Sequence, residues 1–364
     1  MEWVRGGEVG RGSFGMVNLA IPRKTSSCQN PSLMVVKSCE TSKSDTLKNE
    51  KEVISQLQDC PQIVRFFGDN LSVEDGENLY NLLFEYAPKG TLADRLKSSG
   101  DGFTECDVRR YTKDVLMGLC YIHDRGFAHC DIKLQNVLLF QDGAVKICDF
   151  GLARRPSEEK ERGGSGFFLR GTPLYMSPEV VSGGGEAESP ADIWALGCMV
   201  VEMITGKPAW RFSLGCDVTA LLYRIAILGE SPEIPEDLCP EGKDFLANCF
   251  RRDPNERWTA RMLLEHPFVS GFEDDLYRDI KDEVDDRKPS TSPRCPMDFP
   301  SWVSTESSKT ETNMRSYHPE YSPCSGVWEE QSASERESAS RRIRQLVGYR
   351  VPDWIDSDGW ITVR

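Results

Sequence analysis

The sequence predicts an α+β fold of two lobes followed by a tail. Residues 3–86 have the strand-like pattern of apolar side chains, apart from one helical stretch at about 43–58. Residues 105–140 and 191–270 instead have mostly the apolar spacing of helices. The last part of the chain, 272–364, is acidic and then rich in Ser, Pro and Glu, which predicts a largely disordered regulatory tail.

The composition excludes several classes of protein. The 364 residues suggest about two folded units at roughly 150 residues each. A net charge of −14 argues against non-specific binding to nucleic acid or anionic membranes. The thirteen cysteines include no CxxC pair, and no apolar run approaches the ~20 residues of a membrane span. We therefore expect a cytoplasmic and in part nuclear protein, with no membrane or nucleic-acid partner.

The small first lobe is predicted to contain strands and one helix. The strands are expected at residues 2–10, 16–21, 33–39 and 79–86, and the helix buries Leu47, Val53, Ile54 and Leu57. In the larger lobe, one long helix would bury Val108, Tyr111, Val115, Leu116, Leu119 and Ile122 and end at Gly126. The junction of two such lobes is a common place for a ligand cleft.

A glycine-rich loop lies near the start of the chain. Gly10, Gly12 and Gly15 have GxGxxG spacing, which lets backbone N–H groups approach phosphates. A dinucleotide-binding loop would lead into a helix, whereas a strand-like stretch ending at Pro22 follows here. The pattern therefore favours a strand–turn–strand flap over a nucleotide, with an ordinary glycine-rich hairpin as the alternative.

Lys37 lies in a strand that is otherwise apolar on both faces. A buried lysine needs a compensating partner, and Glu50 on the following helix is the expected one. Glu52 is the rival, but helical spacing puts Glu50 on the side of Ile54 and Leu57. The alternative is that Lys37 extends to solvent from an edge strand.

The stretch "HCDIKLQN" interrupts an apolar run with polar side chains. Asp131 could accept the proton of an attacking hydroxyl, and Asn136 could bind a metal through its amide oxygen. Lys133 could neutralise charge on a transferred phosphoryl group, while His129 would be structural. Asp149 follows an apolar strand and begins "DFG", an arrangement suited to chelating Mg²⁺ between phosphates.

These motifs together resemble the eukaryotic protein kinase superfamily over about residues 3–271. The resemblance implies a bilobal fold with lobes at 3–86 and 87–271, ATP and Mg²⁺ between them, and Phe84 as gatekeeper. It also pairs Arg257 with Glu179. The residues it assigns to catalysis are Asp131, Lys133 and Lys37, and those it assigns to the metal are Asn136 and Asp149. Around ATP it places Val9, Gly10, Arg11, Gly12, Ser13, Phe14, Gly15, Val17, Val35, Lys37, Glu50, Glu85 and Ala87.

The subfamily can also be predicted. Lys133 together with "GTPLYMSPE" resembles serine/threonine kinases, and Thr172 would lie near Asp131. The stretches "FFLRGTPLYMSPEVV" and "DCPQIVRFFGD" resemble plant mitogen-activated protein kinase kinase kinases. That resemblance implies MAP kinase kinases as substrates, a role in stress and abscisic-acid signalling, and a monomer or transient oligomer.

Two other classes of function remain as alternatives. A pseudokinase scaffold would usually lack Lys37, Asp131 or Asp149, and all three are present. A lipid or small-molecule kinase is disfavoured by the "GTPLYMSPE" loop, which is typical of peptide docking.

The chain departs from the kinase pattern at three positions. Cys130 stands where the family has an arginine that binds a phosphorylated activation loop. Val35 stands in place of an alanine and would add bulk above the adenine, and Ser177 replaces another alanine without an expected consequence.

Several serines and one basic segment are candidates for regulation. In the activation loop these are Ser157 and Ser165, while Thr172 is expected to be structural. In the tail, Ser292 and Ser322 precede prolines. Residues 341–347, "RRIRQLV", resemble a docking peptide for a regulator, with a solvated charge run or a nuclear-import signal as the alternatives.

Because Cys130 cannot bind a phosphate as arginine does, we expect activity to depend less on activation-loop phosphorylation than it does in kinases that have the arginine. The purified protein is treated with a phosphatase, and its rate of phosphoryl transfer is compared with that of untreated protein. The rate should stay within about twofold, and a collapse of activity would refute the expectation.

Overall fold

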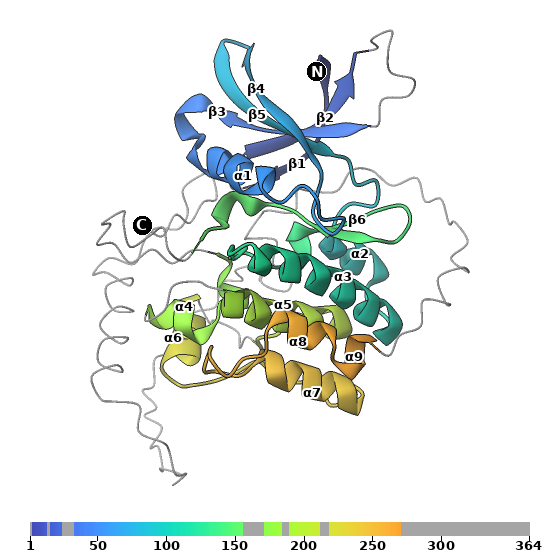
Figure 1. Cartoon of the computed structure of the whole chain (residues 1–364), viewed down its shortest axis with the longest axis vertical. Helices are drawn as coiled ribbons and strands as arrows, with labels where there is room; N and C mark the ends of the chain where they lie inside the picture. The colour runs from blue at the N-terminus through green and yellow to red at the C-terminus, as the bar shows by residue number, and fades with distance from the viewer. Residues whose placement is uncertain are drawn as a thin grey trace, which may run out of the picture.

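The structure, a computed structural model, describes residues 2–12, 15–23, 33–155, 171–183, 189–211 and 218–270. Strands gather in one lobe and helices in the other, as Figure 1 shows, so the predicted α+β fold is confirmed. The tail 272–364 and the serines at 157 and 165 lie outside the described residues. In the part that is described, no helix combines the length and apolarity that crossing a membrane requires.

The small lobe is an antiparallel sheet with one helix packed against it. Its strands are β1 (Trp3–Gly12), β2 (Gly15–Pro22), β3 (Met34–Glu40), β4 (Phe66–Glu74) and β5 (Glu77–Glu85), in the order β1-β2-β3-β5-β4. Helix α1 spans Asp45–Ser55 and buries Leu47, Val53 and Ile54, as predicted. Strand β3 therefore lies between β2 and β5, so Lys37 is on a central strand and the alternative of an edge strand is wrong.

Strand β4 was not among the predicted strands. Its sequence contains Gly68, Asp69 and Asn70, which are residue types depleted in strands. It forms at the edge of the sheet, with an irregular register between Phe66 and Gly68, and is anchored through Asp69. The carboxylate of Asp69 accepts hydrogen bonds from Lys51 of α1 and Tyr80 of β5, each at 2.9 Å. Tertiary contacts thus decide the conformation of this segment.

The large lobe is mainly helical. Its helices are α2 (Leu92–Ser99), α3 (Glu105–Asp124), α4 (Pro178–Ser182), α5 (Ser189–Thr205), α6 (Val218–Ala226), α7 (Pro240–Cys249), α8 (Ala260–Leu264) and α9 (Pro267–Ser270). Helix α3 buries the predicted apolar face and ends before Gly126, whose φ of 75° suits glycine. The prediction that the helical region extends to residue 140 was wrong, because strands β6 (Val137–Leu139) and β7 (Val145–Ile147) form a short hairpin directly after the stretch "HCDIKLQN".

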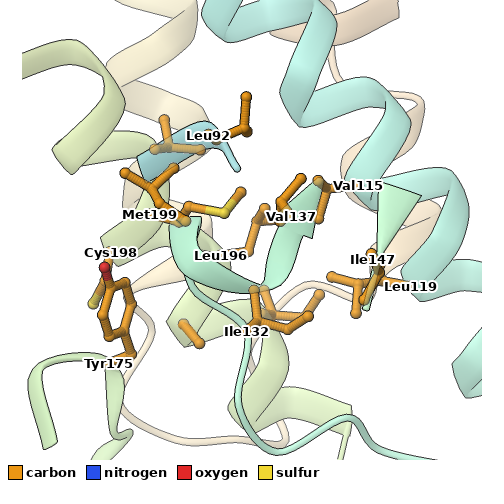
Figure 2. Packing of buried hydrophobic residues seen from close by; sticks show 14 of the residues in the cluster. Leu92, Val115, Leu119, Ile132, Val137, Ile147, Tyr175, Leu196, Cys198 and Met199 are labelled. Atoms are coloured by element: carbon orange, nitrogen blue, oxygen red, sulfur yellow. The ribbon is translucent and has the colours of Figure 1, made fainter. Parts of the chain in front are cut away.

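Helix α5 lies at the centre of the large lobe and is apolar on nearly every side. Figure 2 shows Leu196 and Met199 of α5 among buried side chains that include Val137 of β6 and Ile132. Ile132 is the residue after Asp131 and is 1% exposed. The loop that carries the polar side chains is therefore fixed from behind by a close-packed apolar core.

A buried ion pair joins the start of α4 to the segment between α7 and α8. Arg257 donates to both carboxylate oxygens of Glu179, at 2.7 and 3.0 Å, as the sequence predicted. The same guanidinium donates to the carbonyl oxygens of Pro190 and Arg251, and its side chain is fully buried. The pair is thus bidentate and its remaining donors are also satisfied.

Replacing Arg257 with leucine should lower the free energy of unfolding by about 3–5 kcal/mol, because Glu179 then lacks its partner. Urea unfolding of the full chain measures the loss. Arg261→Ala, which breaks an exposed ion pair with Asp124, serves as the control and should cost about 1 kcal/mol or less. An equal loss of unfolding free energy in the two variants would contradict a stabilising role for the buried Arg257–Glu179 pair.

Candidate active site

Three charged side chains meet between the lobes. The Lys37 ammonium donates to Glu50 of α1 and, at 2.9 Å, to Oδ1 of Asp149. All three side chains are at most 3% exposed. The two carboxylates supply the anionic partners that a buried ammonium needs, and they fix its position from two directions.

The elements that carry this triad explain its geometry. Lys37 lies opposite Val17 on β2 and Leu82 on β5, in the middle of the sheet. Glu50 is on the buried side of α1, whereas Glu52 is exposed, so the rival partner is excluded. Asp149 has φ 68°, a left-handed conformation that is uncommon for a residue with a side chain and is often found at functional sites.

A second cluster forms around Asp131 in the loop between α3 and β6. Its carboxylate accepts a hydrogen bond from Thr172 at 2.8 Å and from Asn136 at 3.0 Å, and it pairs with Lys133 at 2.9 Å. Lys133 also donates to the Thr172 hydroxyl at 2.7 Å. A carboxylate can accept about four hydrogen bonds, so Asp131 keeps capacity for a substrate hydroxyl.

Asn136 belongs to the second cluster and has one oxygen to spare. Its amide nitrogen donates to the carbonyl oxygen and the carboxylate of Asp131, at 2.8 and 3.0 Å. Its amide oxygen is buried and has no hydrogen-bond partner among the described residues. Such an oxygen is costly unless a cation or donor binds it, and with the Asp149 carboxylate it supplies the hard oxygen ligands that Mg²⁺ prefers.

Backbone contacts to Asp192 of α5 hold the Asp131 loop in place. The Asp192 carboxylate accepts hydrogen bonds from the backbone N–H groups of His129 and Cys130, both at 2.8 Å, and contacts the His123 ring at 2.9 Å. Burial opposes ionisation, but these hydrogen bonds and the neighbouring histidines keep the pKa of Asp192 below its ordinary value. The charged carboxylate thus anchors the loop from the core.

His129 has the structural role that was predicted for it. Its Nδ1 accepts from the backbone N–H of Asp131 at 3.3 Å, so Nε2 is the atom that donates to the Cys148 carbonyl at 3.1 Å. The ring also packs edge-on against Phe150, with centroids 4.9 Å apart. The imidazole therefore connects the loop of Asp131 to the strand end that carries Asp149.

Cys130 lies in the same loop, with φ 65° and its thiol 3.5 Å from the Ala128 carbonyl. Burial raises the pKa of the thiol well above its ordinary value, and the Asp192 carboxylate adds to the effect. The side chain is neutral at physiological pH and carries none of the donors with which arginine binds phosphate.

Strands precede and follow the glycine-rich segment, as predicted, and they pair antiparallel as β1 and β2. Gly12 and Gly15 face each other at the end of the β1–β2 hairpin, and Gly10 lies opposite Val17. A Cβ at Gly15, whose φ is 147°, would lie 2.2 Å from the carbonyl oxygen of Ser38. Glycine is therefore required there. The predicted contacts at Ser13 and Phe14 fall outside the described residues.

The remaining predicted cofactor contacts lie along the sheet and at its exit. Val35 of β3 lies opposite Phe84 of β5, and Glu85 ends that strand. The Glu85 carboxylate pairs with Lys146 at 2.6 Å, while Ala87 accepts a backbone hydrogen bond from Gly90 at 3.2 Å. On β1, Val9 is half-buried and Arg11 is exposed.

This geometry agrees with the comparison to protein families. The model of the protein kinase domain matches residues 3–269. The chain belongs to the protein kinase family. It is a Ser/Thr protein kinase, a class that uses ATP and typically Mg²⁺ to phosphorylate protein substrates.

The kinase is similar to curated proteins of Arabidopsis thaliana. It is 45% identical to "Mitogen-activated protein kinase kinase kinase 20" over 367 residues, which span the whole of both chains. Identity to "Mitogen-activated protein kinase kinase kinase 17" is 41% over 272 residues, or 74% of this chain and 70% of that protein. Identity to "Mitogen-activated protein kinase kinase kinase 18" is 36% over 370 residues, covering 100% and 99% of the two chains. The predicted resemblance to plant kinases of this group is confirmed.

Sequence reasoning missed two polar contacts near the site. Asn49 of α1 donates to backbone carbonyls of the segment after Asp149. Tyr175, in the loop after Thr172, donates to the carboxylate of Glu202 on α5. Nothing in the spacing of either residue marks it, because each depends on a tertiary contact between distant segments.

Burial raises the pKa of Glu202 from its ordinary value to about 7, although the hydrogen bond from Tyr175 partly opposes this. The folded protein therefore binds this proton more tightly than the unfolded chain does. Between about pH 5 and about pH 8 the free energy of unfolding should fall as pH rises, by roughly 3 kcal/mol at most from this group. Glu202→Gln should remove that part of the fall.

Urea unfolding of both proteins at the two pH values tests this. The wild type should lose more stability than the variant on going to high pH. Parallel pH profiles would show that Glu202 is already ionised in the folded protein at low pH.

Proposed function

We propose that this kinase transfers the γ-phosphate of ATP to Ser or Thr of MAP kinase kinases, with Asp131, Lys133 and Lys37 as the catalytic side chains. The observation that supports this most directly is the pair of polar clusters, one around Lys37 and the other around Asp131. One cluster offers a cation for phosphates, and the other offers a carboxylate acceptor. Phosphoryl transfer requires this combination of positioning and charge.

Each side chain has a separate task in this proposal. Asp131 orients the attacking hydroxyl and accepts its proton, and Lys133 stabilises charge on the transferred group. Lys37 binds phosphate oxygens of ATP and is oriented by Glu50. Asn136 and Asp149 would hold Mg²⁺, which neutralises charge on the phosphates when bound.

The proposed substrate rests on the relatives. Three similar proteins are named as kinases of MAP kinase kinases, and two of the three align over essentially the full length of both chains. A role in stress and abscisic-acid signalling, a cytoplasmic and partly nuclear location, and a monomeric or transiently oligomeric state stay predictions. The binding of a regulator by the tail also stays a prediction.

The scaffold alternative is not favoured. A pseudokinase commonly has a lost or displaced lysine or aspartate, whereas Lys37, Glu50 and Asp149 are in contact here and Asp131 is held by Asn136, Lys133 and Thr172.

Asp131→Asn should lower the rate of phosphoryl transfer about 10²–10⁴-fold, because the amide cannot accept the proton of the hydroxyl. The full chain is given labelled ATP and a MAP kinase kinase whose own active-site lysine has been replaced. Phosphorylated residues are identified by mass spectrometry. Asp75→Asn, the same change at an exposed hairpin turn, is the matched control and should retain the rate.

Two results would contradict the proposal in different ways. An equal rate in Asp131→Asn and wild type would exclude Asp131 as the catalytic acceptor. Autophosphorylation without transfer to any MAP kinase kinase would leave the kinase activity and exclude the proposed substrate class.

A further inference from the structure

Asn49 connects α1 directly to the segment that follows Asp149. Its side-chain amide donates to the carbonyl oxygens of Gly151 at 3.0 Å and Ala153 at 2.9 Å, with a longer contact to Phe150 at 3.4 Å. Two amide hydrogens are thus shared among three backbone acceptors. These carbonyls belong to the short helix Phe150–Leu152 and its end, and Asp149 is the residue directly before that helix.

The two segments also fit closely on either side of Asn49. A Cβ at Gly151 would lie 2.6 Å from Cγ2 of Thr46, so the backbone touches the helix surface there. Further along α1, Gln56 accepts a hydrogen bond at 2.7 Å from Arg155. Asn49 therefore lies in the middle of a continuous contact along one side of the helix.

Two neighbouring residues of α1 therefore act on Lys37, one directly and one through Asp149. Glu50 binds the ammonium itself, and Asn49 binds the segment whose first residue, Asp149, contacts the same ammonium. A rotation or outward shift of α1 would break both connections together.

The contact between α1 and the Asp149 segment matters more in this chain because residue 130 is a cysteine. A kinase with arginine at this position can bind a phosphorylated activation loop, whereas the neutral thiol of Cys130 cannot. The chain therefore needs another means of keeping α1 and the Asp149 segment aligned.

We propose that Asn49 is the positioning residue that aligns Glu50 and Asp149 on Lys37 without a phosphate on the activation loop. This rests on the proposed function as a kinase. The amide acts through the backbone of the Asp149 segment and does not touch the substrates.

A purely helical role for Asn49 makes the opposite prediction. Alanine has a higher helix propensity than asparagine, so Asn49→Ala would then preserve or improve the protein. If Asn49 positions Asp149, the same change removes all three donated contacts and lowers the rate.

The test uses the full chain, treated with phosphatase, in four forms. These are wild type, Asn49→Ala, Asn49→Asp, and Glu52→Ala as a control on the exposed side of the same helix. We expect kcat to fall about tenfold in Asn49→Ala, and further in Asn49→Asp, where a carboxylate faces carbonyl oxygens. KM for the protein substrate should stay within about twofold in every form.

Asn49→Ser gives a graded check, because its hydroxyl keeps one donor and should give an intermediate kcat. Wild-type kcat in Asn49→Ala, or an order of rates that follows helix propensity, would overturn the proposal. An equal loss in the Glu52→Ala control would do the same.

Hydrogen exchange separates this inference from the proposed function. Amide protons of residues 150–153 should exchange faster in Asn49→Ala than in wild type, whether or not the protein transfers phosphate. Unchanged exchange would overturn the positioning role alone. An inactive wild type that still shows the difference would refute the proposed function and leave the contact established.

Discussion

The buried ammonium of Lys37, where the two lobes meet, is the constraint on which the site depends. An ammonium that is 1% exposed is stable only with anionic partners close by. One partner comes from α1 and the other from the segment after β7, so three separate parts of the chain must meet at one nitrogen. The sheet, the helix and the junction with the large lobe are positioned together by this requirement.

The large lobe provides a rigid base for the second half of the site. The buried carboxylate of Asp192 holds the backbone at His129 and Cys130, and His129 in turn reaches the carbonyl before Asp149. Asp131 and Asn136 are then fixed by hydrogen bonds to each other. This network is anchored in α5, which is buried along most of its length. The cluster of Asp131, Lys133 and Asn136 should therefore move as one body with the large lobe.

The sequence predicted those parts of the site that depend on local pattern. Lys37 in an apolar strand and Glu50 on the apolar side of a helix could each be recognised from a few neighbours, and so could the polar interruption at Asp131. Strand β4 could not, because Gly, Asp and Asn disfavour strands and only its contacts to α1 and β5 stabilise it. Asn49 was missed for a similar reason, since its acceptors lie about a hundred positions further along the chain.

We propose that Glu50 holds the Lys37 ammonium in the orientation that phosphoryl transfer requires. The kcat of Glu50→Gln tests this, because the variant keeps the shape and a hydrogen-bond acceptor but removes the charge. We expect kcat to fall about tenfold or more, because a charge-assisted hydrogen bond is replaced by a neutral one. A folded variant with kcat within about twofold of wild type would contradict it.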